Sequence, residues 1–257
     1  EAEEAMKPKS LTLANMVLAF GVFAVGWVML GRVPPLVMGT HAEFAPFSLR
    51  ESGEDAPVAG FDVELGRAIA ETAGRELKIV DLPFEELIPA LEAGTVDMLL
   101  ASMTITPERA KRVAFSDPYY RATQVVLLKA GGAVPDAKAE LKGRRIGVQS
   151  GTTSEAVARE LTEAENIRAV PTGMAAVADL LNGEADVVLM DEQPAVHVLK
   201  KNPDLRLIYL DFDDEYYGVA VRKGSVKLLE AVNQTLAEIA EDGRYDWFLD
   251  RWMLQAD

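Results

Sequence analysis

An arginine stands at the start of a short predicted helix in the segment TITPER, residues 104–109. Thr106 suits the N-cap position of that helix, and Pro107 suits its first helical position. Arg109 therefore lies in the first turn, where the helix dipole disfavours a cation by up to about 1 kcal/mol unless an anion is close. Because a guanidinium donates two parallel hydrogen bonds to a carboxylate, we expect Arg109 to meet either an anionic ligand or a protein acid such as Glu108.

Two later segments offer groups for the other parts of such a ligand. The segment QSGTT, residues 149–153, is a glycine turn before a predicted helix, whose first amides either bind an anion or are simply capped. Asp191 ends an apolar run and is either an anion of the site or the N-cap of the next helix. A cation with amides opposite an anion fits a zwitterion such as an α-amino acid. Phe44 and Phe84 would then be apolar walls for its side chain, whereas each alone is typical of a core.

These candidate residues follow short apolar runs that alternate with segments of helical period. Strands that alternate with helices of ten or more residues predict parallel βαβ units and an α/β fold. In such sheets ligands bind beyond the carboxyl ends of the strands, where His41, Ser102 and Thr104 also lie. The expected strands cover 36–40, 77–82, 95–102, 144–150, 167–172 and 186–192, and the expected helices cover 60–74, 84–94, 153–164 and 174–185.

The chain contains an internal repeat, because LEAGTVDMLLAS and LLNGEADVVLMD match at a constant offset of 89 residues. Gly94 matches Gly183, and Asp97 matches Asp186. We therefore expect two similar α/β lobes, joined twice by extended segments that act as a hinge. Lobe I is predicted over 33–121 and 217–257, lobe II over 125–212, and the hinge strands near 119–125 and 212–219.

The composition argues against several classes of function. The 257 residues are 49% hydrophobic and 26% charged, which is typical of a globular protein, and the net charge of −15 argues against a nucleic-acid partner or adsorption to anionic lipid. Cysteine is missing from the sequence, and the two histidines, His41 and His197, show no metal-ligand spacing. We therefore expect neither a metal nor a cofactor.

Residues 10–31 form a stretch of 22 residues without a charge. As a helix this stretch spans a bilayer core of about 30 Å, and Lys7 and Lys9 favour a cytoplasmic N-terminus. The alternative is a secretory signal with a cleavage site at AVG, residues 24–26. We expect residues 1–32 to be a cytoplasmic stub with a retained membrane anchor, or else a signal segment. Either exports the remaining chain to the periplasm or the outer face of the cytoplasmic membrane.

Five segments occur in a fixed order between residues 33 and 257: GTHAEFAPFSL, GFDVELGRAIAETAG, FEELIPALEAGTVDMLLASMTITPERAKRVAFSDPYY, RRIGVQSGTTSEA and ADVVLMDE. Together they resemble the periplasmic amino-acid-binding proteins of ATP-driven importers, the group that holds the glutamine, histidine and lysine/arginine/ornithine receptors. The resemblance implies a two-lobed fold of the type II periplasmic-binding-protein class with a two-strand hinge. It also implies a monomer that captures an L-α-amino acid and delivers it to an ABC permease.

The same resemblance implies roles for the residues that face the charged end of the ligand. Arg109 corresponds to the residue that binds the α-carboxylate, helped by the amides of Thr104 and Thr153. Asp191 and the carbonyl of Ser102 correspond to the groups that hold the α-ammonium, with the Thr104 hydroxyl assisting.

Other positions correspond to the side-chain end of the ligand. Phe44 and Phe84 occupy the positions of aromatic residues that enclose the side chain, and Gln149 and Ser150 lie where lobe II touches the ligand. His41 departs from the pattern, because basic and glutamine-type receptors usually have an aspartate there. Since the distal acid is missing, we expect glutamine or another polar, uncharged amino acid.

Two alternative functions remain open on the sequence alone. One is an enzyme on the same scaffold that resembles the cyclohexadienyl or prephenate dehydratases, for which Glu43 and Asp191 are the nearby carboxylates. The other is a membrane-tethered amino-acid sensor that signals through residues 10–31.

Overall fold

The computed structural model describes residues 33–50 and 56–254. The chain divides into two compact units, Glu1–Pro34 and Pro35–Asp257, and the elements below belong to the second unit. Within the described part of the chain, we find no helix with the length and apolar character needed to cross a membrane. The predicted anchor or signal segment over 10–31 lies outside the described residues.

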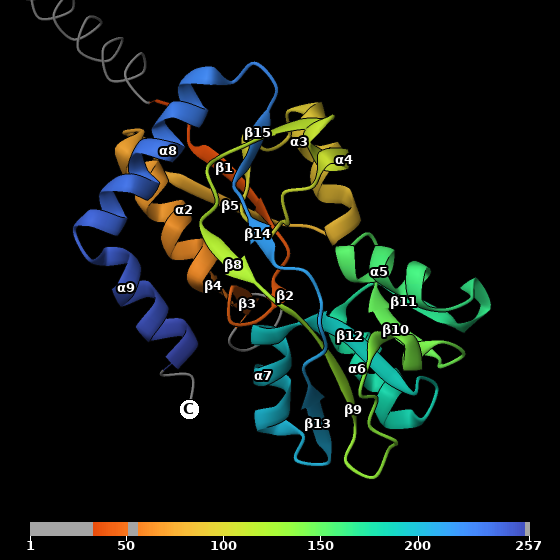
Figure 1. The fold of residues 1–257 in the computed structure, drawn as a ribbon. Helices are drawn as coiled ribbons and strands as arrows, with labels where there is room; N and C mark the ends of the chain where they lie inside the picture. Colours follow the sequence, from red (N-terminus) through yellow and green to blue (C-terminus); the bar gives the residue numbers. More distant parts are fainter. Residues whose placement is uncertain (1–32, 51–55, 255–257) are drawn as a thin grey trace, which may run out of the picture. The chain divides into compact units, whose positions relative to one another are not determined.

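The first sheet has five strands in the order β5 (Leu77–Asp81), β1 (Leu36–Thr40), β6 (Met98–Leu99), β15 (Ala220–Arg222) and β7 (Val113–Phe115). β1 is parallel to β5 and β6, whereas β15 is antiparallel to both of its neighbours. Three helices pack on one face and one on the other: α2 (Phe61–Thr72), α8 (Val226–Glu241) and α9 (Arg244–Leu249), and opposite them α3 (Leu87–Ala93). Figure 1 shows α2, α8 and α9 lying together beside this sheet. We call this sheet with its helices lobe I.

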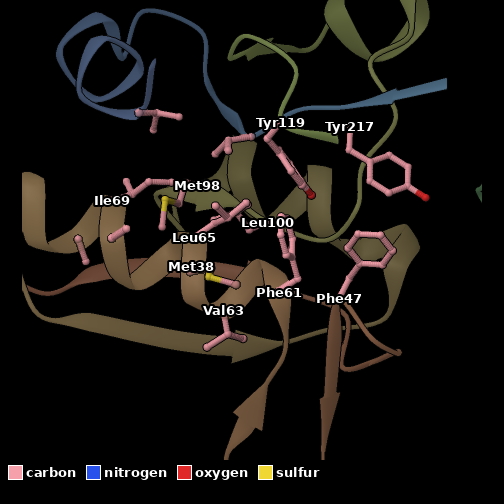
Figure 2. Packing of buried hydrophobic residues seen from close by; sticks show 14 of the residues in the cluster. Met38, Phe47, Phe61, Val63, Leu65, Ile69, Met98, Leu100, Tyr119 and Tyr217 are labelled. Carbon is pink, nitrogen blue, oxygen red and sulfur yellow. The ribbon is translucent and has the colours of Figure 1, made fainter. Parts of the chain in front are cut away.

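The period of its apolar residues explains why α2 forms and how it packs. Phe61, Leu65 and Ile69 are spaced by four residues, so they share one helix face, and all three are fully buried. Figure 2 shows them against Met38 of β1 in the core of lobe I. Burial of each such side chain contributes roughly 1.5–3 kcal/mol. The helix stops before Gly74, whose φ of +62° only glycine adopts at low cost.

The second sheet has five strands in the order β11 (Ile167–Val170), β10 (Ile146–Gln149), β12 (Val187–Asp191), β9 (Gln124–Lys129) and β13 (Leu205–Ile208). β10 is parallel to β11 and β12, and β9 is antiparallel to β12 and β13. Its faces are covered by α6 (Gly173–Asn182) and α7 (Glu192–Lys201) on one side and α5 (Thr153–Leu161) on the other. We call this sheet with its helices lobe II.

The predicted repeat is present in the backbone of both lobes. Gly94 and Gly183 end α3 and α6 with the same left-handed conformation, φ 78° and ψ 16°. Asp97 accepts a hydrogen bond from the backbone N–H of Val37 near the start of β1, and Asp186 accepts one from the backbone N–H of Arg145, just before β10. The matched glycines therefore end corresponding helices, and the matched aspartates accept from the backbone at the start of corresponding strands. The mixed α/β architecture is confirmed in both lobes.

Two chain crossings connect the lobes. β8 (Tyr120–Ala122) leads from lobe I into lobe II, β14 (Glu215–Tyr217) leads back, and the two pair antiparallel as a two-stranded ribbon. Each crossing continues into the sheet that it enters, as β9 and β15. The smaller elements are β2 (Glu43–Phe44), β3 (Ser48–Arg50), β4 (Val58–Ala59), α4 (Pro107–Ala110), the 3-10 turns η1 (Phe84–Glu86), η2 (Lys138–Leu141) and η3 (Ala164–Asn166), and the π-helix η4 (Asp250–Leu254).

The predicted strand over 95–102 is the clearest difference between expectation and structure. Only Met98–Leu99 pair as a strand, although Leu100 and Ala101 are also buried. The ladder ends because Ser102 has a φ of +48°, which turns the backbone away from the sheet. The residues that follow this turn carry the candidate site.

We predict that Gly60→Ala destabilises the protein at the junction between β4 and α2. Gly60 has a φ of +130°, and a Cβ there would lie 2.1 Å from the carbonyl oxygen of Phe47. Overlap and backbone strain together should lower the free energy of unfolding by about 3 kcal/mol or more in urea titrations. Gly74→Ala is the matched control, because its φ is +62° but its Cβ would meet nothing within 4 Å, so it should cost only about 1 kcal/mol. Equal losses in the two variants would contradict this.

Candidate ligand-binding cleft

A cavity lies at the carboxyl ends of β1 and β6 of lobe I and of β10 and β12 of lobe II. This is the edge at which parallel α/β sheets bind ligands. Nine of the ten residues that the sequence analysis selected line it: His41, Phe44, Phe84, Ser102, Thr104, Arg109, Gln149, Thr153 and Asp191. Ser150 does not line the cavity, and its backbone N–H instead bonds to Val170 beside β10.

Arg109 reaches across the cavity from lobe I to lobe II. Thr106 caps the helix α4 by accepting a hydrogen bond from the Arg109 backbone, as predicted. The guanidinium donates from Nη1 to the Thr104 carbonyl at 2.9 Å and from Nη2 to the Gly151 carbonyl at 3.0 Å. Its Cζ lies 5.3 Å from the centre of the Phe84 ring.

The environment of Arg109 is short of negative charge at hydrogen-bond distance. Burial lowers the pKa of Arg109, and the charges of Glu215 and Asp191 partly oppose that shift. Among the described residues, Arg109 makes no ion pair within 4.0 Å, and Glu108 pairs with Lys111 instead. The expectation that a neighbouring acid holds the guanidinium is therefore wrong, and a desolvated cation faces the cavity.

Backbone amides beside Arg109 add further donors for an anion. In the described chain, the N–H groups of Thr104, Thr153 and Ser154 have no protein acceptor. Thr153 and Ser154 begin α5, so their N–H groups belong to the free first turn of a helix. The Thr152 hydroxyl caps that helix by accepting from the backbone N–H of Glu155. The backbone N–H groups of Thr153 and Ser154, two residues that line the cavity, stay free for a ligand. Both lobes thus present donors to the same region.

Asp191 supplies the opposite charge from the end of β12. Asp191 occupies the N-cap position of α7, as one of the two alternatives expected, but its side chain makes no capping hydrogen bond. Oδ2 accepts a hydrogen bond of 2.5 Å from the Tyr217 hydroxyl, and the buried Oδ1 has no partner among the described residues. Burial and, to a smaller extent, the nearby charge of Glu215 raise the pKa of Asp191 to about 7, against the lowering effects of Tyr217 and Arg109.

Glu215 is a residue that the sequence analysis missed. From β14 it accepts hydrogen bonds from the hydroxyls of Thr104 in lobe I, at 2.6 Å, and Thr153 in lobe II, at 2.8 Å. Its other oxygen accepts from the Gln124 amide at 2.6 Å. Glu215 therefore links both lobes and both crossings beneath the cavity. The alternation of DEYYG carries a signal for this, because it places Glu215 and Tyr217 on the same side of the strand.

His41, Phe44 and Phe84 line a part of the cavity that we call its far end. His41 Nδ1 lies 3.0 Å from the Leu82 carbonyl, which only accepts, so Nδ1 carries the proton. Nε2 of the neutral ring is then an acceptor, and it is buried without a partner among the described residues. The Phe84 ring lies edge-on to His41 at 6.5 Å, and Phe44 stacks on Phe47. This end suits an apolar chain that ends in a hydrogen-bond donor.

The model of the bacterial extracellular solute-binding proteins, family 3, matches residues 36–255. The chain belongs to this family. It is therefore a solute-binding protein and not an enzyme.

Several relatives and solved structures are similar over most of the chain. The arginine-binding extracellular protein ArtP of Bacillus subtilis is 32% identical over 96% of this chain and 98% of its own length. The L-arginine-binding protein of Pseudomonas aeruginosa is 34% identical over 93% of each. An ancestral arginine-binding protein bound to glutamine is 37% identical, with a TM-score of 0.80 over 85% of this chain and 97% of that one.

We predict that ligand binding weakens in acid because Asp191 must release a proton. A ligand ammonium requires the carboxylate, whereas the free site holds its proton below about pH 7. The association constant should be constant above that pH and fall by up to about tenfold per unit below it. Calorimetry at pH 6 in two buffers of different ionisation enthalpy should show proton release.

The variant Glu215→Gln gives an independent check on this titration. Removing the charge that raises the pKa of Asp191 should move the midpoint of the affinity profile to lower pH. Arg109 and Tyr217 are the other groups that shift the Asp191 pKa, and both are retained. An unchanged midpoint, or binding at pH 6 without proton release, would contradict the role of Asp191.

Proposed function

We propose that this protein captures a polar L-α-amino acid between its two lobes. Two observations carry the proposal: among the residues that the structure describes, the desolvated Arg109 has no ion-pair partner, and the buried Oδ1 of Asp191 has no hydrogen-bond partner. A zwitterion satisfies both groups at once, because its carboxylate and ammonium are fixed on adjacent atoms. A simple anion would leave Asp191 unpaired, and a simple cation would leave Arg109 unpaired.

The polar groups set the orientation of the ligand. Its α-carboxylate accepts from Arg109 and from the amides of Thr104 and Thr153. Its α-ammonium donates to Asp191 and to the carbonyl of Ser102. Since these donors come from both lobes, neither lobe alone holds the carboxylate, and binding favours the closed arrangement.

The side chain of the ligand extends between Phe44 and Phe84 toward His41. Because Nε2 of His41 accepts, we propose a side chain that ends in an N–H donor, and we take glutamine and arginine as the two test ligands. Relatives named as arginine-binding and glutamine-binding proteins support this pair. The histidine replaces an acid, so glutamine is the expected preference.

We propose that the β8 and β14 ribbon is the hinge between lobe I, over 33–121 and 217–257, and lobe II, over 125–212. The protein would act as a monomer and present its closed form to an ABC permease. The dehydratase alternative is not favoured, since the family is one of binding proteins. Glu43, a carboxylate named for that chemistry, is exposed and does not line the cavity.

We further propose that residues 1–32 export the domain, either as a retained anchor or as a cleaved signal. Twenty-two uncharged residues and the extracellular character of the family support export. Amino-acid capture beside the membrane fits transport, and a neighbouring permease gene would favour transport over a sensory output.

We predict that Arg109→Ala abolishes tight binding while the fold persists. A desolvated carboxylate left unpaired costs on the order of 2–5 kcal/mol, so the dissociation constant for L-glutamine or L-arginine should rise about a hundredfold or more. Lys111→Ala is the control, because Lys111 is exposed and pairs only with Glu108. Wild-type affinity of Arg109→Ala in calorimetry would defeat the assignment of the carboxylate site.

We predict that the wild-type protein distinguishes L-glutamine from L-methionine, which has a similar length but no N–H donor on its side chain. A buried acceptor left unpaired at His41 should weaken methionine by about tenfold or more. His41→Phe keeps a ring but removes the acceptor, so the preference should disappear. Thermal-shift and calorimetric titrations measure both ratios. Equal binding of the two ligands by the wild type would contradict this account of the far end, and a protein stabilised by none of the twenty amino acids would overturn the proposed function.

A further inference from the structure

Ser102 has a backbone conformation that serine rarely adopts. Its φ is +48°, and it is the one non-glycine residue with a positive φ in the part of the chain described here. Such conformations are strained for an L-residue and persist only where the surroundings hold them. Ser102 also lines the cavity and is 6% exposed. The strain therefore occurs at the ligand site.

The turn leaves one polar backbone group without a protein partner. In the described part of the chain, no donor bonds to the Ser102 carbonyl, although the residue is buried. The neighbouring Leu100 N–H and Met103 carbonyl both make regular backbone bonds. The backbone is thus anchored on both sides of Ser102, and the unpaired acceptor belongs to the residue with the strained φ.

The fully buried carboxylate of Asp62 binds Ser102 and holds this backbone conformation. Asp62 Oδ2 accepts from the Ser102 backbone N–H at 2.8 Å and from the Ser102 hydroxyl at 3.3 Å. Its Oδ1 accepts from the Tyr119 hydroxyl at 2.9 Å. Figure 2 shows Tyr119 directing its hydroxyl into the core of lobe I, whereas Tyr217 directs its hydroxyl away from it. Asp62 is 0% exposed, so these hydrogen bonds lie in the protein interior.

The position of Asp62 in the fold favours the ionised form of its side chain. Asp62 lies in the first turn of α2, where the free amides and the helix dipole favour an anion. Burial raises the pKa of Asp62 and the hydrogen bonds from Tyr119 and Ser102 oppose that shift, which leaves the pKa at about 6 and the carboxylate mostly ionised at neutral pH. Hydrogen bonds to an ionised acceptor are stronger than neutral ones. An ionised Asp62 can therefore hold the Ser102 N–H against the preference of serine for negative φ.

We infer that Asp62 is a positioning residue for the ligand site: its carboxylate holds Ser102 in the left-handed conformation and so presents the Ser102 carbonyl to the ligand ammonium. The inference rests on the proposed function for the identity of that ammonium. Asp62 does not line the cavity, so it acts only through Ser102. The hydrogen bond joins the first turn of α2 to the turn that follows β6, and its two residues lie 40 apart in sequence.

The test is a double-mutant cycle between Asp62 and Ser102. If Asp62 acts by holding a strained φ, glycine at 102 removes the need for it, because glycine adopts a positive φ without strain. Asp62→Ala should raise the dissociation constant about tenfold with serine at 102, but less than about threefold with Ser102→Gly as the background. The probes are L-glutamine and L-arginine, titrated by calorimetry at pH 8. An equal loss in both backgrounds would overturn the inference.

Two further variants keep the test decisive. Asp62→Asn retains an acceptor of the same shape, so it should fold where Asp62→Ala does not, give a smaller loss, and show the same relief by Ser102→Gly. Tyr119→Phe removes only the hydrogen bond to the other carboxylate oxygen, so its dissociation constant should stay within about threefold of the wild type. A tenfold loss in Tyr119→Phe would show that Asp62 serves the general packing of lobe I, against the inference.

A ligand-free measurement separates this inference from the proposed function. NMR of the unliganded protein reports the φ of Ser102 through its intraresidue amide-to-Hα contact. In the wild type φ should be positive, and in the Asp62 variants it should move to negative values. A positive φ that survives the loss of the carboxylate would overturn the inference even if amino acids bind. Binding of no amino acid by the wild type would instead overturn the proposed function and leave this readout intact.

Discussion

The proposed function depends on a half-buried arginine that meets carbonyl groups but, among the described residues, no carboxylate at hydrogen-bond distance. Arg109 is held by carbonyls of both lobes and by the face of Phe84. These contacts satisfy part of its hydrogen-bonding capacity and none of its charge, because a carbonyl is only a dipole. A desolvated cation in this state is costly unless an anion arrives. Asp191 also lines the cavity, and among the described residues one of its oxygens has no partner. The ligand must therefore carry a positive charge as well as a negative one.

The duplicated architecture explains how two opposite half-sites come to face each other. Each lobe brings the carboxyl ends of parallel strands to the cavity, and each lobe receives an antiparallel strand from the crossing chain. The crossings also carry Gln124 and Glu215, which bond to each other and to threonines of both lobes. The same two segments therefore connect the lobes and bond to threonines that line the cavity. Any movement of the lobes must change the contacts of the residues that underlie the ligand.

Much of this could be predicted from the sequence because the informative signals are local. Strand and helix periodicity, the two glycines at matched positions and the Thr106-Pro107 helix start each lie within a few residues of what they determine. Arg109 could be selected because a cation in the first turn of a helix is disfavoured unless an anion is close, and Asp191 because it ends an apolar strand at the edge of the sheet where ligands bind.

The contacts that the sequence did not predict are those between distant residues. Glu215 bonds to Thr104 and Gln124 across 111 and 91 residues, and Asp62 bonds to Ser102 across 40. No periodicity encodes such pairs, since each depends on how the two crossings and α2 pack. Ser150 was selected together with Gln149, but of the two only Gln149 lines the cavity. The backbone N–H of Ser150 bonds to Val170 of the neighbouring strand β11.

A crystal structure of the protein grown with L-glutamine or L-arginine tests the central claim most directly. The account requires the ligand carboxylate to lie within hydrogen-bond distance of Arg109 and of the amides of Thr104 and Thr153, with the ammonium on the free oxygen of Asp191. A ligand bound in the reverse orientation would contradict it. So would an empty cleft in which Arg109 has turned to pair with an acid of the protein.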